Sequence, residues 1–187
     1  LMNYLVLFPF IITFLAGVIL YLVPKKFNNV FKVVTGIIIT YLFFHTFYSF
    51  FKTPQNCEIN LPLFGGYKLL FGVKTKLASL FIFFIGIVSL LIYIYSLKST
   101  HDLKYIKEFN IYYLWSAGFS YIILITGDLL VILGAWGFLG FTLYKLVNID
   151  RHKGARQAKK VFLLIGATDA IFVLDVGILY SIAKTFN

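Results

Sequence analysis

Long apolar runs alternate with short polar segments along the whole chain. Six of these runs reach the roughly 20 residues that a helix needs to cross a bilayer. They cover residues 4–23, 30–51, 77–97, 110–127, 129–148 and 161–183. Because backbone groups in lipid must be hydrogen-bonded internally, such runs form helices. The pattern predicts an all-α integral membrane protein, with about six transmembrane helices in a single membrane domain over residues 1–187.

Residues 52–76 depart from this pattern. Two short apolar runs lie there on either side of Gly65 and Gly66. A glycine pair between two such runs is a hairpin signal, because tight hairpin turns need the positive φ that glycine adopts easily. We therefore expect a short extramembrane β-hairpin between the second and third spans.

Composition supports a membrane location. Of the 187 residues, 60% are hydrophobic and 13% are charged, whereas a soluble domain carries about 25% charged residues. The net charge of +10 could indicate a nucleic-acid partner, but the cations lie in short segments between apolar runs. We therefore expect no nucleic-acid binding. Cys57 is the single cysteine, which excludes an internal disulfide.

The distribution of cations predicts the orientation. Twelve of the 17 Lys and Arg residues lie in or beside the connections after spans one, three and five, and five lie on the other side. Connections rich in Lys and Arg stay on the side from which the protein is inserted. Both termini and the hairpin are therefore expected outside, with the cationic loops in the matrix or cytoplasm.

The connection at 151–160 holds five of these cations: Arg151, Lys153, Arg156, Lys159 and Lys160. It is interpreted either as a topological anchor that contacts neighbouring subunits or as a binding site for anionic phospholipid head groups such as those of cardiolipin.

Four stretches of the chain resemble, in order, motifs of the antiporter-like subunits of respiratory complex I, which are related to the Mrp cation/proton antiporters. They are VSLLIYIYS (88–96), LITGDLL (124–130), WGFLGFTLY (136–144) and ARQAKKVFLLIGATDAIFVLDVGILY (155–180). The Asp169–Ala170 pair is most similar to the subunit 5 type, with subunits 2 and 4 as close alternatives. The resemblance covers the whole chain but only the front part of the family's longer set of helices.

The resemblance implies a subunit without cofactor, redox centre or metal, surrounded by other complex I membrane subunits. A separate chain would supply the remaining antiporter-like helices. The chain departs from the family at three positions that matter for proton transfer. Gly137 stands where the family has a buried glutamate that pairs with a lysine on the seventh helix, and Tyr93 stands where it has a histidine. The family's aspartate before the third helix falls near Thr75.

Four ionisable residues remain as candidates for a proton path. Asp169 and Asp175 lie inside the sixth span, about 120° apart around the helix, so we do not expect them to share a partner. Asp169 is either a structural cap to a neighbouring helix or a proton carrier, and Asp175 is either a proton carrier or the pair of a cation on another chain. His45 is either hydrogen-bonded in the bundle or part of a relay. Lys145 is either an interfacial anchor or a displaced channel lysine.

Three glycines of the fifth span, Gly134, Gly137 and Gly140, are expected to allow close helix packing. The resemblance implies a non-redox membrane-arm subunit of a proton-pumping NADH:ubiquinone oxidoreductase, with no catalytic centre of its own. It would be the N-terminal fragment of a split antiporter-like subunit in the mitochondrial inner membrane, or alternatively in a bacterial inner membrane. Two further alternatives are an Mrp-type antiporter fragment and a purely structural assembly subunit.

Overall fold

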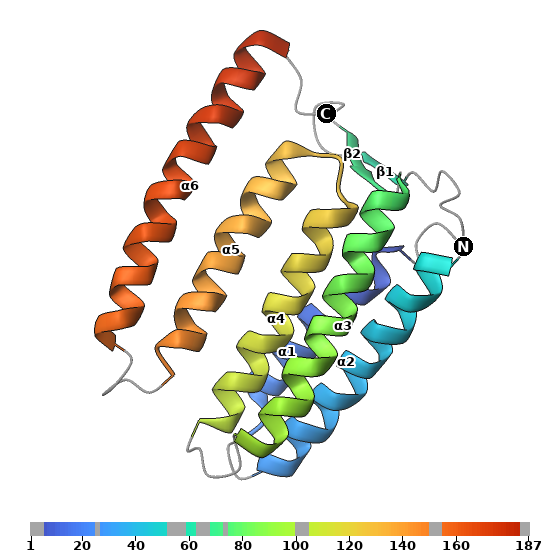
Figure 1. The fold of residues 1–187 in the computed structure, drawn as a ribbon, viewed down its shortest axis with the longest axis vertical. Coiled ribbons are helices and arrows are strands. Elements are labelled where there is room, and N and C mark those ends of the chain that lie inside the picture. The colour runs from blue at the N-terminus through green and yellow to red at the C-terminus, as the bar shows by residue number, and fades with distance from the viewer. Residues whose placement is uncertain are drawn as a thin grey trace.

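The computed structural model describes residues 6–24, 27–51, 59–62, 68–72, 75–99, 105–149 and 155–183. These residues form six helices and two strands: α1 (Phe8–Leu22), α2 (Asn28–Phe51), β1 (Ile59–Pro62), β2 (Lys68–Phe71), α3 (Lys76–Ser99), α4 (Ile106–Ile125), α5 (Leu129–Val147) and α6 (Ala155–Ala183). Successive helices run in opposite directions, so α1, α3 and α5 descend and α2, α4 and α6 rise in Figure 1. The expected all-α membrane fold is confirmed.

Four helices, α2, α3, α5 and α6, are long and apolar enough to cross a membrane by length and composition. The described part of α1 is apolar but has 15 residues. The 20-residue helix α4 carries Lys107 and Glu108 in its first turn. It nevertheless runs parallel to the spanning helices, inside the bundle (Figure 1).

Helix α4 forms the centre of the molecule. Eleven of its residues are buried, and it contacts α1, α2, α3 and α5. One neighbour, α1, approaches very closely at two points, where Gly17 of α1 faces the Trp115 ring and Gly118 faces Thr13 of α1. Small residues permit such close approach where lipid gives apolar side chains no reason to associate.

Several side chains of the first four helices donate hydrogen bonds to the backbone of a neighbouring helix. The Tyr93 hydroxyl donates to the Lys32 carbonyl at 2.8 Å, and the Tyr113 hydroxyl donates to the Ser89 carbonyl. The Lys107 ammonium donates to two carbonyls at the end of α1, those of Tyr21 (2.7 Å) and Val23 (2.6 Å). A cation at a helix C-terminus is favourable because the last carbonyls carry partial negative charge.

The hairpin is present, with β1 and β2 paired antiparallel from Ile59 opposite Phe71 to Pro62 opposite Lys68. Gly65 and Gly66 lie outside the described residues. The second strand docks on the α4–α5 connection, where Phe71 bridges to Thr126 and the Gly72 amide donates to the Ile125 carbonyl at 2.7 Å. The hairpin therefore covers one end of the bundle (Figure 1).

Two helices begin four or more residues earlier than the apolar pattern indicates. Helix α4 begins at Ile106 instead of 110, because its polar first turn packs against α1. Helix α6 begins at Ala155 instead of 161, so Arg156, Lys159 and Lys160 belong to a helix and not to a loop. Hydropathy alone misses polar helical turns that continue beyond the hydrocarbon core.

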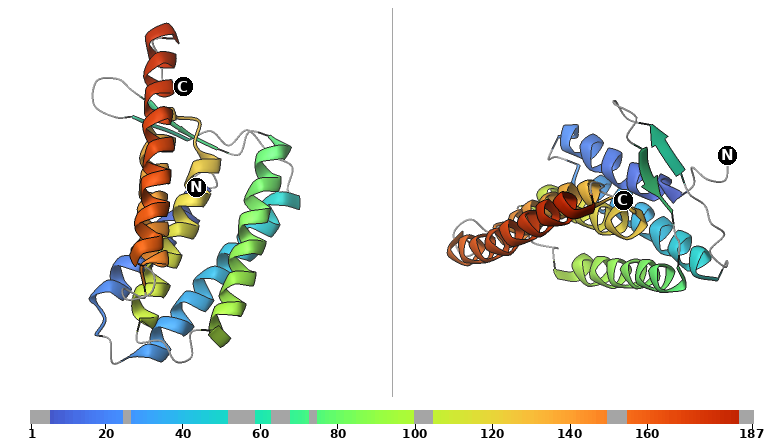
Figure 2. Two further views of the ribbon diagram at one scale, coloured as in Figure 1. Left: turned by 60° about the vertical axis from the view of Figure 1, so that its left-hand side comes forward. Right: turned by 90° about the horizontal axis from the view of Figure 1, so that it is seen from above.

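Helix α6 lies at the margin of the molecule. It packs mainly against α5, and the view from above in Figure 2 shows it on the far side of α5 from α3. Only 6% of its most apolar stretch is buried, compared with 33% for α2. Nearly all of its surface is therefore open to lipid or to other proteins.

Candidate functional site: the seam between α5 and α6

The turn before α5 is built by Asp128. This side chain is fully buried, and its carboxylate accepts hydrogen bonds from the amides of Leu130 (2.9 Å) and Val131 (3.2 Å). An aspartate at this position satisfies amides that have no partner within the helix and complements the positive end of the helix dipole. The motif LITGDLL thus corresponds to a capped helix start that also holds the hairpin.

The contact between α5 and α6 is centred on Asp169. Its Oδ1 accepts a hydrogen bond from the Trp136 indole Nε1 at 2.8 Å. The other oxygen lies beside Gly140, where an added Cβ would be 3.7 Å from Oδ2. Phe172 packs near Trp136, with ring centroids 6.2 Å apart. Asp169 therefore links α6 to α5, as expected if its role is to hold a neighbouring helix. Proton transfer through Asp169 stays a prediction.

The three glycines of α5 have different surroundings. Gly140 is buried against α6, where a Cβ would lie 3.2 Å from Ile165 Cγ2. Gly134 and Gly137 are exposed, and a Cβ on either would meet no atom of the described residues within 4 Å beyond its own helix backbone and chain neighbours. The helix that packs closely against Gly140 is therefore α6 of the same chain.

Asp175 has no such partner. It is exposed on α6, and no described residue forms a hydrogen bond or ion pair with it. The turn of about 100° per residue puts it roughly 120° away from Asp169. The two carboxylates are thus separated as expected, with Asp169 in the seam and Asp175 outside it.

His45 and Lys145 lie elsewhere. The His45 ring on α2 is half-buried beside Tyr41 and Tyr121, with centroid distances of 6.0 and 6.2 Å. Lys145 is in the last turn of α5, with its ammonium 5.3 Å from the centroid of the Phe141 ring. The four candidates therefore do not form one site.

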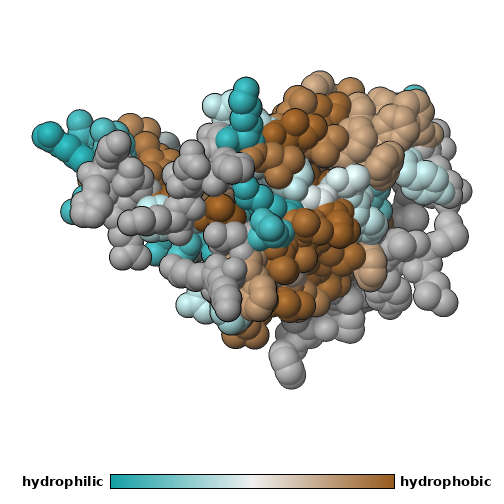
Figure 3. Space-filling model, turned by 90° about the horizontal axis from the view of Figure 1, so that it is seen from below, coloured by the Kyte–Doolittle hydropathy of each residue, from teal (hydrophilic) through white to brown (hydrophobic). Residues whose placement is uncertain are grey.

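The basic residues mark the end of the molecule where α5 ends and α6 begins. Arg156, Lys159 and Lys160 are exposed there, whereas Arg151 and Lys153 lie outside the described residues. Figure 3 views this end and shows hydrophilic side chains at the margin on the α6 side. Cations at a helix N-terminus are disfavoured by the helix dipole, so helix stability does not explain them. Their roles as a topological anchor or in binding anionic phospholipids stay predictions.

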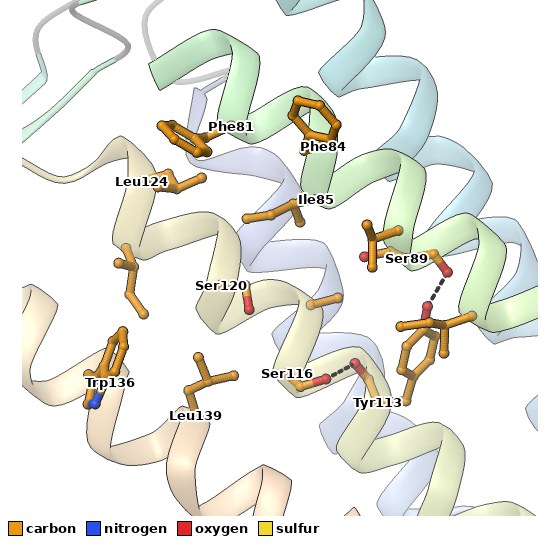
Figure 4. Close-up of a pocket in the computed structure, with 14 residues that line it drawn as sticks. Phe81, Phe84, Ile85, Ser89, Tyr113, Ser116, Ser120, Leu124, Trp136 and Leu139 are labelled. Atoms are coloured by element: carbon orange, nitrogen blue, oxygen red, sulfur yellow. Dashed lines mark hydrogen bonds between the residues drawn. The ribbon is translucent and has the colours of Figure 1, made fainter. Parts of the chain in front are cut away.

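A groove of about 440 Å³ lies on the other side of Trp136, between α3, α4 and α5. Its walls are mostly apolar, including Phe84 and Leu139, and three serines, Ser89, Ser116 and Ser120, lie along it (Figure 4). Trp136 thus borders this groove while its N–H holds Asp169. Among the described residues, no three His, Cys, Asp or Glu side chains gather as a metal site would require.

The contacts of two residues, Trp136 in this seam and Tyr93 on α3, could not be predicted from the sequence. Trp136 is 33 positions away from Asp169, and no local pattern links them. Tyr93, noted at the position of a family histidine, holds α3 to α2 through its hydroxyl. A tyrosine inside an apolar span did signal a need for a hydrogen-bond partner, since buried Tyr hydroxyls usually find one.

Comparison with known proteins gives one line of evidence. No protein-family model matches the sequence, and no curated protein matches it. Among solved structures, a chain of the membrane-bound sulfane sulfur reductase (MBS), an archaeal respiratory membrane complex, is similar over 98% of the present chain, with a TM-score of 0.77 and 20% identity. The match takes up 38% of that chain. At this identity the likeness shows the fold, and the present chain corresponds to well under half of the larger protein.

Proposed function

We propose that this chain is a non-redox membrane-arm subunit of a proton-pumping NADH:ubiquinone oxidoreductase, forming the N-terminal portion of an antiporter-like subunit. The observation that carries the proposal is the fold, which is shared over nearly the whole chain with part of a chain from a respiratory membrane complex. The four sequence stretches that resemble antiporter-like subunits support the same assignment. The proposed location is the mitochondrial inner membrane, with a bacterial inner membrane as the alternative.

The uncovered surfaces of α5 and α6 support a role as part of a larger membrane unit. Gly134 and Gly137 open onto one such surface, and Gly166 and Gly177 of α6 are also exposed, with space for a Cβ. Exposed glycines in spanning helices allow another helix to approach closely. We propose that a separate chain supplies the helices that cover them.

In this proposal, this portion of the subunit contributes little to proton transfer. Gly137 has no titratable group, and a Cβ added there would meet no described atom within 4 Å beyond its own helix backbone and chain neighbours. Asp169 is engaged by Trp136. The Gly137 observation favours a second candidate function, a structural assembly subunit that has lost proton transfer. An Mrp-type antiporter fragment is a third possibility with the same fold.

Affinity isolation in a mild detergent tests the assignment. A tagged chain is isolated from native membranes, and the complex is analysed by native electrophoresis, an NADH:ubiquinone reductase assay and mass spectrometry. Co-isolation of NADH dehydrogenase subunits, together with NADH:ubiquinone reductase activity that rotenone-type inhibitors block, would support the proposal. Isolation with antiporter subunits and no NADH oxidation would favour the Mrp-type alternative. The intact mass of the subunit decides whether the completing helices belong to a separate chain.

A further inference from the structure

Helix α6 presents three distinct faces along its length. One face, with Ile165, Asp169 and Val176, meets α5. A second, with Gly166, Ala170 and Gly177, lies about 100° to one side. The third, which we call the Asp175 face, lies about 120° to the other side. The Asp175 face is exposed throughout and consists of Leu164, Thr168, Ile171, Asp175, Ile178 and Ile182.

Asp175 lies within the part of α6 that crosses the hydrocarbon core. It is 20 residues after Ala155 and eight before Ala183, or about 30 and 12 Å along the helix axis. A core of about 30 Å centred on this helix would extend roughly ten residues either way from its middle. Asp175 is six residues from that middle. A charged carboxylate inside the hydrocarbon core is unfavourable and is normally paired or faces protein.

The described part of this chain offers no cation to Asp175. Its basic residues with described side chains lie at or near helix ends: Lys32, Lys76, Lys98, Lys107, Lys145, Arg156, Lys159 and Lys160. Lys145, Arg156, Lys159 and Lys160 are all at the opposite end of the α5–α6 pair. None of these eight described cations forms an ion pair with Asp175, so a compensating group has to come from beyond the described part of the chain.

The spacing of the Asp175 face fits a helix. Its members recur at intervals of four, three, four, three and four residues, which is the seam that a second helix occupies in helix pairs of small crossing angle. Five of the six positions are aliphatic or threonine, and one is the carboxylate. A single polar residue in such a seam sets the register of the two helices, because any other register leaves it unpaired.

We propose that the Asp175 face docks a transmembrane helix of a partner subunit that carries a lysine or arginine at the depth of Asp175. The carboxylate supplies the specific contact, and the aliphatic residues supply complementary packing. Pairing removes most of the cost of the buried charge, since opposite charges attract strongly where the dielectric is low. This inference rests on α6 crossing the membrane and does not require the respiratory assignment.

The test uses the full chain in its native membrane complex. Asp175→Leu removes the carboxylate and makes α6 more apolar, so it favours insertion of the helix while deleting the proposed contact. We expect at least a tenfold loss of the partner from the isolated complex, with normal amounts of the variant chain in the membrane. Leu174→Ala, on a neighbouring exposed face of the same helix turn, is the matched control and should retain the partner.

A photoreactive residue at position 178 identifies the partner helix. We expect a crosslink to a transmembrane peptide with a Lys or Arg within one helical turn of the crosslinked residue. Changing that basic residue to Asp should restore assembly of the Asp175→Lys variant. The proposal is overturned by crosslinks to lipid alone, by a partner helix without a nearby basic residue, or by an unchanged yield with Asp175→Leu. These outcomes are read independently of any NADH oxidation.

Discussion

Helices α4 and α6 belong to the same bundle, but their polar side chains have different surroundings. Helix α4 carries Lys107 and Asn110 in its first turns, and each finds a backbone carbonyl within the chain: Lys107 in α1, and Asn110 at Ile106 in its own helix. Helix α6 carries Asp169 and Asp175, and only Asp169 is held by a described residue, Trp136. The inner helix therefore holds Lys107 and Asn110 within the chain, whereas Asp175 of the marginal helix forms no hydrogen bond or ion pair with a described residue.

The glycines of the two helices show the same contrast. A Cβ on Gly118 of α4 would collide with Thr13, whereas Gly166 and Gly177 of α6 have open space around them. Small residues in spanning helices favour association only where another helix packs closely against them. The difference indicates that α4 packs closely against α1 at its glycine, whereas the glycines of α6 have no close neighbour among the described residues.

The largest effect is expected from a glycine of the inner helix. Gly118→Leu places a side chain where Thr13 Cβ lies 3.2 Å from the first added carbon, which separates α1 from α4. Overpacking of this kind costs about 3 kcal/mol, so we expect rapid degradation of the chain in membranes. Gly166→Leu is the matched variant in α6 and should leave the chain folded while lowering its yield in the complex. Equal loss of both chains, measured by immunoblot and limited proteolysis, would remove the contrast between the two helices.

A carboxylate at position 137 probes the open surface of α5. Gly137→Glu introduces a charge at an exposed site with no described basic neighbour, at a cost of about 3 kcal/mol within the membrane. We expect reduced yield of the complex. If pumping and assembly are normal instead, a cation on the partner chain still serves this position and the proton path is intact. The ratio of protons pumped to NADH oxidised distinguishes the two results.

The fold could be predicted from the sequence better than the site could. Apolar length and the Gly65–Gly66 pair were enough for the helices and the hairpin, because lipid imposes helix on any long apolar segment. The central position of α4 was harder to see, since a buried helix in lipid is no more apolar than its neighbours. Its signal was the content of small and polar residues, Asn110, Ser116, Gly118 and Ser120, which lipid-facing helices avoid.

Pairings across helices could not be predicted. The Trp136–Asp169 bond depends on the relative rotation of α5 and α6, which no local pattern specifies. The divergence of Asp169 and Asp175 could be predicted, because helical geometry alone separates positions six residues apart by about 120°. The sequence therefore indicated that Asp169 and Asp175 do not share a partner, but it did not indicate which residue each of them contacts.

The seam between α5 and α6 offers a smaller and more local effect. Gly140→Leu forces a side chain against Ile165, which lies 3.2 Å from the added Cβ, and disturbs the Trp136–Asp169 hydrogen bond. We expect a loss of about 1–3 kcal/mol, seen as earlier proteolysis after α5 in membranes. Gly134→Leu, on the same helix with no described atom near its Cβ, should show no such change. Identical proteolysis of the two variants would argue against this seam.

The smallest effect is expected from a hydrogen bond between α2 and α3. Tyr93→Phe removes the hydroxyl that donates to the Lys32 carbonyl at 2.8 Å, which is worth about 1 kcal/mol. Tyr95→Phe is the control, because Tyr95 is 74% exposed. Thermal unfolding of the isolated complex should shift slightly for the first variant and not for the second. A larger shift for Tyr95→Phe would show that the outer face of α3 is covered by a partner.

The most direct measurement compares two side chains that are equally exposed within this chain. Ile37 on α2 is 65% exposed and Ile171 on the Asp175 face of α6 is 64% exposed. Spin labels are attached at Ile37→Cys and Ile171→Cys after the single native cysteine is replaced (Cys57→Ser), and their access to oxygen dissolved in the bilayer is measured in the native complex. We expect free access at position 37 and protection at position 171. Free access at both positions would contradict the proposal, because α6 would then face lipid and Asp175 would have no protein partner.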